Sequence, residues 1–363
     1  MHETVHTLLG TLRIVGAASR DDLISGWRTM SYLPLSRLVQ AEEAEVWLYR
    51  KLREHDLAGA VDPDFLAWLT GRARSISAQN ALVDAQIERT VEALSHAAIP
   101  HIFLKGAARR LLGGAIPYAD ARGMMDVDVL VRPGAEGAAW AALRSRGFET
   151  VPGGERSPHA MPPLVNDIPF SVQVHFSTSD EVSPTDAWER QAGGSEEVIV
   201  RTGAARVPNP TELFWHALTH GISHGIDRFN LRTLLDIATI WALDDGVDWD
   251  ELARRCHDEV VDAREAGIWL GAAAVMAGRE KDVCFGRVPI HPLPRLLRWK
   301  FTVYGRGLGE RPTRKLVREG ARAELGHAIS RDESGASLIP RLRHRVAAGA
   351  ARATYATWRR LMA

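Results

Sequence analysis

The spacing of apolar residues changes twice along the chain, near residue 100 and again near residue 210. Residues 36–57 and 64–97 carry apolar side chains at helical intervals, which predicts a helix over the first range and one or two over the second. Pro100 ends this pattern, because proline disfavours the helical conformation in the residue before it. Short apolar or alternating runs occupy residues 101–207. We therefore expect strands inside an otherwise helical protein.

The middle region predicts alternating strands and helices. The expected strands are 102–104, 126–131, 147–151, 169–176, 197–201 and 205–207, with helices at 107–113 and 135–146. Residues 152–167 are rich in proline and glycine and predict a loop. A helix should open at Asn209-Pro210, since proline fits the first helical turn. The order predicts an α/β (α+β) fold, a mixed sheet with flanking helices embedded between N- and C-terminal helical regions.

Four regions follow from these patterns. They are an N-terminal helical region (1–97), an α/β domain (98–210), a helical domain (211–285) and a basic C-terminal helical region (286–363). Residues 291–363 hold 16 lysines and arginines against 5 acidic residues, although the formal net charge of the 363-residue chain is zero. A basic tail could bind phosphate, a membrane surface or an acidic partner, or dock onto the acidic remainder of the chain.

The overall composition gives few signs of location or partner. Zero net charge does not point to nucleic acid, and Cys256 and Cys284 are too few for a disulfide framework. No apolar run reaches the ~18–20 residues of a membrane span, and the first residues lack the basic and apolar pattern of a signal peptide. We expect a cytoplasmic protein without a transmembrane segment.

The pair Asp126-Val127-Asp128 is the sharpest chemical feature. Residues two apart on a strand face the same side, so the two carboxylates can share one or two divalent cations, an arrangement that phosphoryl chemistry uses. A solvated edge strand would carry the same pattern without function.

The residues before this pair strengthen the chemical interpretation. A buried-looking strand ends at Leu104-Lys105-Gly106. Glycine allows a phosphate to approach the backbone closely, and a following helix would offer free N–H groups. Lys105 and Arg122 would supply positive charge. The alternatives are a surface lysine, and an ion pair of Arg122 with Asp120 or Asp126.

Taken together, Leu104-Lys105-Gly106, Tyr118, Arg122, Asp126-Val127-Asp128 and Gly147-Phe148 resemble the bacterial uncharacterised nucleotidyltransferase family of the DNA polymerase β-like superfamily. The resemblance continues through Gln173, His175, His220 and Asp236, and covers roughly residues 80–280. It implies Mg²⁺- or Mn²⁺-dependent transfer of a nucleoside monophosphate from an NTP to an acceptor. Asp126 and Asp128 would hold the metal, and Lys105, Gly106, Arg122 and Gln173 would bind the nucleotide.

The resemblance leaves the acceptor open. A small molecule, a peptide or a protein would serve, and nucleic acid is not expected. Family relatives occur beside genes for ribosomally made peptides, lasso peptides among them, which adds natural-product biosynthesis as an option.

Two departures, the first from the superfamily pattern and the second from the family pattern, bear on catalysis. The superfamily has a Gly-Ser pair about ten residues before the first aspartate, whereas Ala107 follows Gly106 here and the gap is longer. The family also has an acidic residue where this chain has Gln173, and an amide cannot act as a base. Either Asp167 or Asp180 substitutes, His175 becomes the base, or the chain is a degenerate accessory protein that binds nucleotide without turnover.

His216, His220 and His224 recur every four residues and share one helical face. The metalloprotease pattern is absent, since Ala217 and Gly221 stand where a glutamate is needed. We expect packing or phosphate contact rather than a metal site. Arg232 and Asp236 have the same spacing, which predicts an ion pair within one helix.

Overall fold

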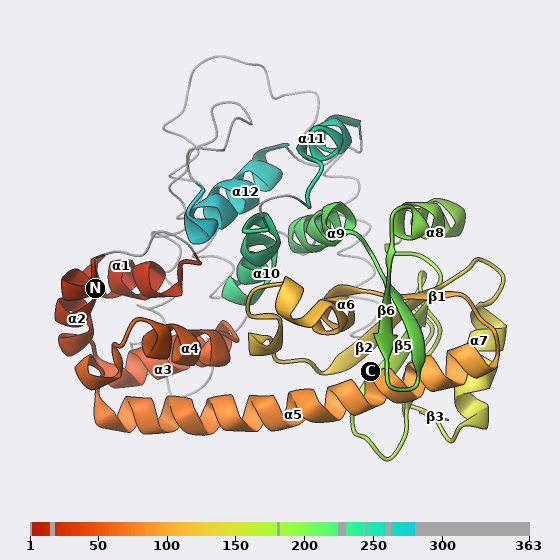
Figure 1. Cartoon of the computed structure of the whole chain (residues 1–363), viewed down its shortest axis with the longest axis horizontal. Helices are drawn as coiled ribbons and strands as arrows, with labels where there is room; N and C mark the ends of the chain where they lie inside the picture. The colour runs from red at the N-terminus through yellow and green to blue at the C-terminus, as the bar shows by residue number, and fades with distance from the viewer. Residues whose placement is uncertain are drawn as a thin grey trace, which may run out of the picture. The chain divides into compact units, whose positions relative to one another are not determined.

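The computed structural model of the chain describes residues 2–14, 19–179, 182–223, 230–243, 246–258 and 263–279, all within one unit over residues 1–324. The basic tail, Asp180, His224 and Cys284 lie outside the described residues. In the described part, the predicted fold class is confirmed: a mixed sheet lies among helices (Figure 1). The four domain boundaries remain predictions.

Short helices precede the sheet: α1 (His2–Leu12), α2 (Arg20–Arg28), α3 (Tyr32–Ala41), α4 (Glu45–Glu54) and the 3₁₀ turn η1 (Ala58–Ala60). The prediction of one helix over 36–57 is wrong. The chain turns at Glu43, whose φ of 55° is left-handed, and α4 starts anew. The apolar stripe continues across the break, so spacing alone did not reveal it.

The helix α5 (Pro63–His96) is a single element of 34 residues. Asp62 caps it by accepting hydrogen bonds from the backbone N–H groups of Asp64 and Phe65. Its first half buries Phe65 among the helices, and its second half buries Val83 and Val91 against the sheet. α5 therefore runs from the N-terminal helices to the sheet, as Figure 1 shows.

The sheet has the strand order β1-β2-β5-β4-β3. Its strands are β1 (His101–Phe103), β2 (Asp126–Val131), β3 (Glu149–Thr150), β4 (Leu164–Val165) and β5 (Ser171–His175). β2 and β5 are parallel, and the other neighbours are antiparallel. β4 lies inside the stretch predicted as a loop, so that expectation is corrected for residues 164–165.

The two faces of the sheet differ in what covers them. Val127, Val129 and Val172 pack with α5 and α7 (Glu136–Ser145) on one face. On the other, Ile102, Leu104 and Leu130 form a small cluster with Trp188 of α8 (Pro184–Ala192). The second face also carries Asp126 and Asp128, because they alternate with the valines of β2.

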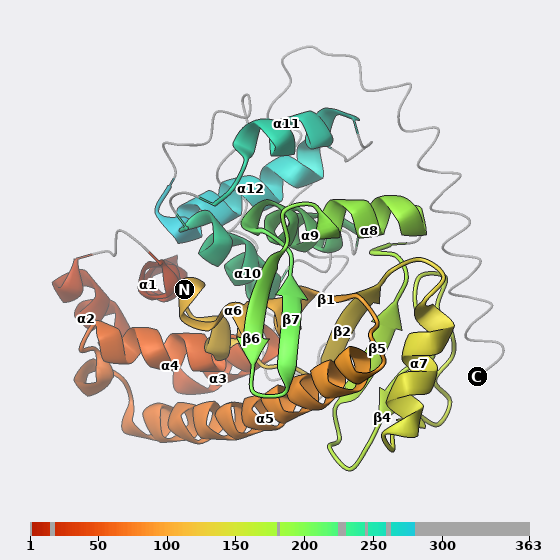
Figure 2. The ribbon, with the colours of Figure 1, turned by 45° about the vertical axis from the view of Figure 1, so that its right-hand side comes forward.

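A hairpin of β6 (Glu196–Val200) and β7 (Gly203–Val207) follows, and Figure 2 shows it between α5 and α9. The remaining elements are α6 (Lys105–Leu112), η2 (Gly113–Ala115), η3 (Ala119–Ala121), α9 (Pro210–Ser223), α10 (Leu231–Trp241), α11 (Trp249–Asp258) and α12 (Ala263–Ala277). The later helices share one apolar core with the N-terminal helices, joining Leu8, Phe65, Phe214 and Trp241. None of the described helices has an apolar stretch that could cross a bilayer.

Candidate active site

The paired aspartates open strand β2 and face the same side. The register places Asp126 beside Ser171 and Asp128 beside Gln173 of the parallel strand β5. Partners in adjacent strands present their side chains to one face of the sheet. One polar surface is therefore formed by Asp126 and Asp128 of β2 with Gln173 and His175 of β5. The sequence predicted both the shared face of the aspartates and that of Gln173 with His175.

Asp128 is almost fully buried, at 4% exposure, and both of its oxygens have a partner. Lys105 Nζ lies 3.0 Å from Oδ2, and His175 Nε2 lies 2.7 Å from Oδ1. Burial opposes ionisation of this carboxyl, but Lys105 and His175 outweigh it and hold the pKa of Asp128 below its usual value. Asp128 is therefore a fixed carboxylate.

Asp126 is the open member of the pair, because its residue is solvent-exposed while the rest of β2 is buried. Neighbouring protein atoms still surround much of its carboxyl, and this partial burial, together with the charge of Asp128, raises the pKa of Asp126. Two carboxylates side by side repel each other until a cation lies between or beside them. The pair thus offers a cation two carboxylates, the accessible one of Asp126 and the one of Asp128, which Lys105 and His175 hold in place.

His175 is 2% exposed and points its Nε2 at Asp128 rather than at solvent. Its ring stacks on that of His159, with 5.5 Å between centroids and 20° between planes. Burial lowers the pKa of His175, which favours the neutral ring. This geometry suits a residue that holds Asp128 in place.

Lys105 begins α6 in a left-handed conformation, with φ of 48°. This region is costly for a residue with a side chain and is seen where the surroundings impose it. The backbone N–H of Leu104 donates to the carbonyl of Asp128 at 3.0 Å, so the turn is tied to β2. The strained turn thereby directs the lysine toward Asp128, with a quarter of its side chain exposed.

Gly106 makes room for Arg122, a different role from the phosphate approach that the sequence suggested. A Cβ at Gly106 would lie 2.1 Å from Nη1 of Arg122 and 3.0 Å from Cε of Met124. The guanidinium thus passes directly over the first turn of α6. Asn80 fixes the loop beneath it by donating to the carbonyls of Asp120 and Arg122 at 3.1 and 2.9 Å.

Asp236 of α10 joins two arginines from the α/β region. Its Oδ2 lies 2.9 Å from Arg122 Nε, and its Oδ1 lies 3.3 Å from Arg109 Nε. Arg109 is 4% exposed and also donates to the backbone carbonyl of Asp236 and to Thr239. Neither expected partner of Arg122, Asp120 or Asp126, takes this place.

The predicted ion pair of Arg232 with Asp236 is corrected by these contacts. Arg232 bonds Glu43 at the turn between α3 and α4, whereas Asp236 serves Arg109 and Arg122. Helical spacing brought the two residues to one side of α10, but stronger partners from distant segments compete for each. Nothing in the sequence pattern pointed to Arg109, because its partner lies 127 residues away.

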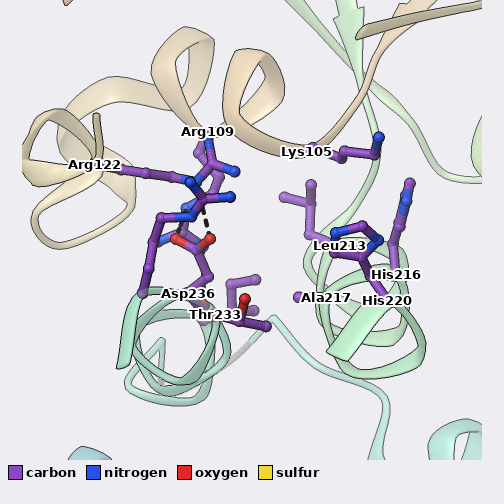
Figure 3. A pocket seen from close by; sticks show the side chains of 11 residues that line it. Lys105, Arg109, Arg122, Leu213, His216, Ala217, His220, Thr233 and Asp236 are labelled. Atoms are coloured by element: carbon purple, nitrogen blue, oxygen red, sulfur yellow. Dashed lines mark hydrogen bonds and ion pairs between the residues drawn. The ribbon is translucent and has the colours of Figure 1, made fainter. Parts of the chain in front are cut away.

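A pocket lies between α6, α9 and α10 (Figure 3). Its lining is Lys105, Arg109, Arg122, Leu213, His216, Ala217, His220, Arg232, Thr233, Asp236 and Ile240. Arg109 and Arg122 reach toward Asp236 on one side, and the α9 residues His216 and His220 stand on the other (Figure 3). The structure thus brings Lys105 and Arg122 to one cavity beside the paired aspartates.

The acid proposed as a substitute for the missing third carboxylate, Asp167, is 72% exposed and pairs with Arg89 of α5. It belongs to a surface ion pair, whereas Gln173 occupies the position directly beside Asp128.

The donor set fits Mg²⁺ bound with its substrate. No group of three or more His, Cys, Asp or Glu side chains suited to a metal occurs in the part of the chain that the structure describes. Magnesium commonly uses one or two carboxylates and completes its shell with phosphates and water. Asp126 and Asp128, beside the amide of Gln173, match that mode, and an all-protein cage is not needed.

Comparison with known proteins gives a family-level match. A family model described as "Uncharacterised nucleotidyltransferase" matches residues 34–264, well over half of the chain. The match includes α5, the sheet, the paired aspartates and the pocket. A search of curated proteins found no match.

Proposed function

Since the chain belongs to the uncharacterised nucleotidyltransferase family, we propose that it transfers a nucleoside monophosphate from an NTP to an acceptor hydroxyl or similar group. The acceptor hydroxyl would lose its proton to water and its oxygen would bond to the α-phosphorus. The bond from that phosphorus to the bridging oxygen would break, and pyrophosphate would leave. The observation that carries this proposal is the placement of Asp126 and Asp128 on one face of β2, beside Lys105 and a cationic pocket.

Asp126 and Asp128 would hold Mg²⁺ or Mn²⁺, which neutralises and aligns the polyphosphate when bound. Lys105 would stabilise charge on the phosphates, since its ammonium already lies between Asp128 and the pocket. Arg122 adds a second cation at the first turn of α6.

We assign His175 a positioning role in this reaction. Its Nε2 bonds Asp128 and its ring is buried under His159, so it keeps the carboxylate from rotating. A base that accepts the acceptor's proton must reach the acceptor, and a ring 2% exposed does not.

Gln173 favours a second candidate function, a nucleotide-binding accessory protein without turnover. It stands beside Asp128 where an acid would complete the metal site, and its amide can ligate but not accept a proton. Calorimetry separates the two: the accessory protein binds an NTP but releases no pyrophosphate with any acceptor.

The proposed reaction is tested with α-³²P-labelled NTPs, Mg²⁺ and fractions of small molecules, peptides and proteins as acceptors. We expect label transfer and pyrophosphate release by the wild type and neither by Asp126→Asn. Asp167→Asn is the matched control, because it removes a carboxylate in a surface pair with Arg89 and should leave transfer unchanged. Undiminished transfer by Asp126→Asn would exclude the paired aspartates from the reaction.

A further inference from the structure

The pocket beside the aspartates is built by two parts of the chain. Lys105, Arg109 and Arg122 come from the α/β region, and Arg232 with Asp236 comes from α10. Its charged lining is thus four basic residues and one acid. Three further acids lie near these cations without lining the pocket. Asp128 pairs with Lys105 and Glu43 with Arg232, and the charge of Asp126 acts on Lys105, Arg122 and Arg232.

The basic residues of the pocket differ in how many of their nitrogens bond to protein groups. Arg109 is buried and donates to Asp236 and Thr239. Arg122 is bonded only along one edge, from Nε to Asp236. Within the described residues, no protein group bonds its terminal nitrogens, although the side chain is only 14% exposed. A guanidinium with a free fork in a nearly buried position is set to receive an oxyanion.

Asp236 and Gly106 fix the direction of that fork. Asp236 holds the Nε edge at 2.9 Å, while the absence of a side chain at Gly106 lets Nη1 lie over the turn at Lys105. Asp236 is therefore a positioning residue for Arg122. Its own charge is shared with Arg109, so it does not fully cancel the charge of the fork.

The rest of the lining, from α9 and α10, supplies apolar surface and neutral polar groups. Leu213, Ala217 and Ile240 are apolar, Thr233 offers a hydroxyl, and burial keeps His216 uncharged at neutral pH, with a pKa of about 3. A wall of this kind neither repels an anion nor provides carboxylates for a cation.

We infer that this pocket binds a phosphate-type oxyanion of a substrate, with the Arg122 fork and Arg232 as its principal contacts. The inference rests on the proposed function for its substrates, because two of them can carry such a group. One is the polyphosphate of the NTP, and the other is a phosphate on the acceptor.

The test is calorimetric titration of the full-length protein with inorganic pyrophosphate in EDTA, so that no divalent metal contributes. We expect saturable 1:1 binding that weakens at least tenfold in Arg122→Gln and in Arg232→Gln. Arg201→Gln is the control, since Arg201 is 80% exposed in a surface pair with Glu88, and it should bind like the wild type. If loss of Arg122 impairs folding, Arg232→Gln still tests the pocket. Arg232 forms its ion pair with Glu43, whose side chain is half-exposed, so we expect this variant to fold.

A second titration identifies the source of the oxyanion. The protein is first saturated with Mg²⁺ and α,β-methylene analogues of the four NTPs in turn. Loss of pyrophosphate binding assigns the pocket to the NTP polyphosphate, and undiminished binding assigns it to a phosphate of the acceptor.

Failure of the inference and failure of the proposed function are distinguishable. Asp126→Asn should abolish nucleotide transfer but retain pyrophosphate binding in EDTA. Asp126 does not line the pocket, and loss of its negative charge near Arg122 and Arg232 removes a repulsion of the anion. A wild type that does not bind pyrophosphate, or equal affinity in the wild type and both arginine variants, overturns the inference whether or not transfer occurs.

Discussion

At the scale of single residues, the site depends on close contacts that leave little freedom. Gly106 is in α6, where alanine would ordinarily be favoured over glycine by about 0.5–1 kcal/mol. Here the added Cβ would meet Arg122 Nη1 at 2.1 Å. Arg122 can move only by leaving Asp236, so the usual preference should be reversed.

We predict that Gly106→Ala destabilises the protein by about 1–3 kcal/mol and weakens pyrophosphate binding. The matched control is Gly71→Ala in α5, where a Cβ meets nothing within 4 Å. This substitution should raise the free energy of unfolding by at most about 1 kcal/mol. Chemical denaturation of both variants measures the difference. Stabilisation of the two proteins by equal amounts would contradict the close packing of Arg122 on α6.

His216 gives a prediction on pH dependence. Burial lowers its pKa to about 3 from the usual 6.5, with Lys105 adding to the effect. Below pH 6.5 the unfolded chain therefore binds a proton that the folded chain does not, and the folded state loses stability at up to about 1.4 kcal/mol per pH unit. His216→Asn removes this loss, so the stability gap between wild type and variant should shift in favour of the variant from pH 6.5 to pH 4.5.

Urea denaturation of both proteins at several pH values measures that gap. The other buried histidines, His101 and His175, titrate in both proteins and cancel in the difference. A gap that stays constant from pH 7.5 to 4.5 would show that His216 is not held neutral.

At the scale of elements, the sequence predicted what local patterns encode. The alternation in Asp126–Val131 gave β2 with its correct ends. The apolar spacing over 64–97 placed α5 to within one residue at each end, although it left open whether one helix or two span the range. The two-residue strand β4 was missed, because its pairing with β3 and β5 and not its composition makes it a strand. The break at Glu43 was missed because the apolar stripe runs on through it.

The candidate site divides in the same way. Spacing on β2 and β5 correctly put Asp126 with Asp128, and Gln173 with His175. The sequence could not show that Lys105 and His175 bind Asp128, or that Asp236 binds Arg122, because these contacts join segments 23 to 114 residues apart. The competition that separates Arg232 from Asp236 is also a property of the folded chain alone.

A prediction for Gln173 belongs to the scale of elements, because the parallel register of β2 and β5 places this residue beside Asp128. In Gln173→Glu, a third carboxylate of almost the same shape joins the pair. We expect tighter Mn²⁺ binding, by about tenfold or 1.4 kcal/mol, since carboxylates are better ligands for this hard cation than an amide. Titration followed by the Mn²⁺ electron paramagnetic resonance signal measures it.

Gln40→Glu is the control for that experiment, because Gln40 is exposed on α3 and adds the same charge away from the sheet. Equal Mn²⁺ affinity in the two variants would show that residue 173 does not share a metal site with Asp128.

At the scale of the whole molecule, the α/β region and the later helices meet in one ion network. α5 connects the N-terminal helices to the sheet, and α10 contributes Asp236 to Arg109 and Arg122. Glu42 adds a second link by accepting the backbone N–H of Leu231 at the start of α10. The pocket exists only when these parts are assembled.

Removal of the shared carboxylate should therefore affect folding and binding together. Asp236→Asn leaves two largely buried guanidinium groups without their counter-charge, and breaking a buried ion pair in this way costs about 3–5 kcal/mol. Asp56→Asn is the comparison, since Asp56 is 89% exposed in its pair with Arg20 and such surface pairs contribute about 0–1 kcal/mol. We expect denaturation to separate the two variants by at least 2 kcal/mol, and pyrophosphate affinity to fall only in Asp236→Asn. If Asp236→Asn were as stable as Asp56→Asn, then Arg109 and Arg122 would be adequately solvated without Asp236, and α10 would not govern the direction of the Arg122 fork.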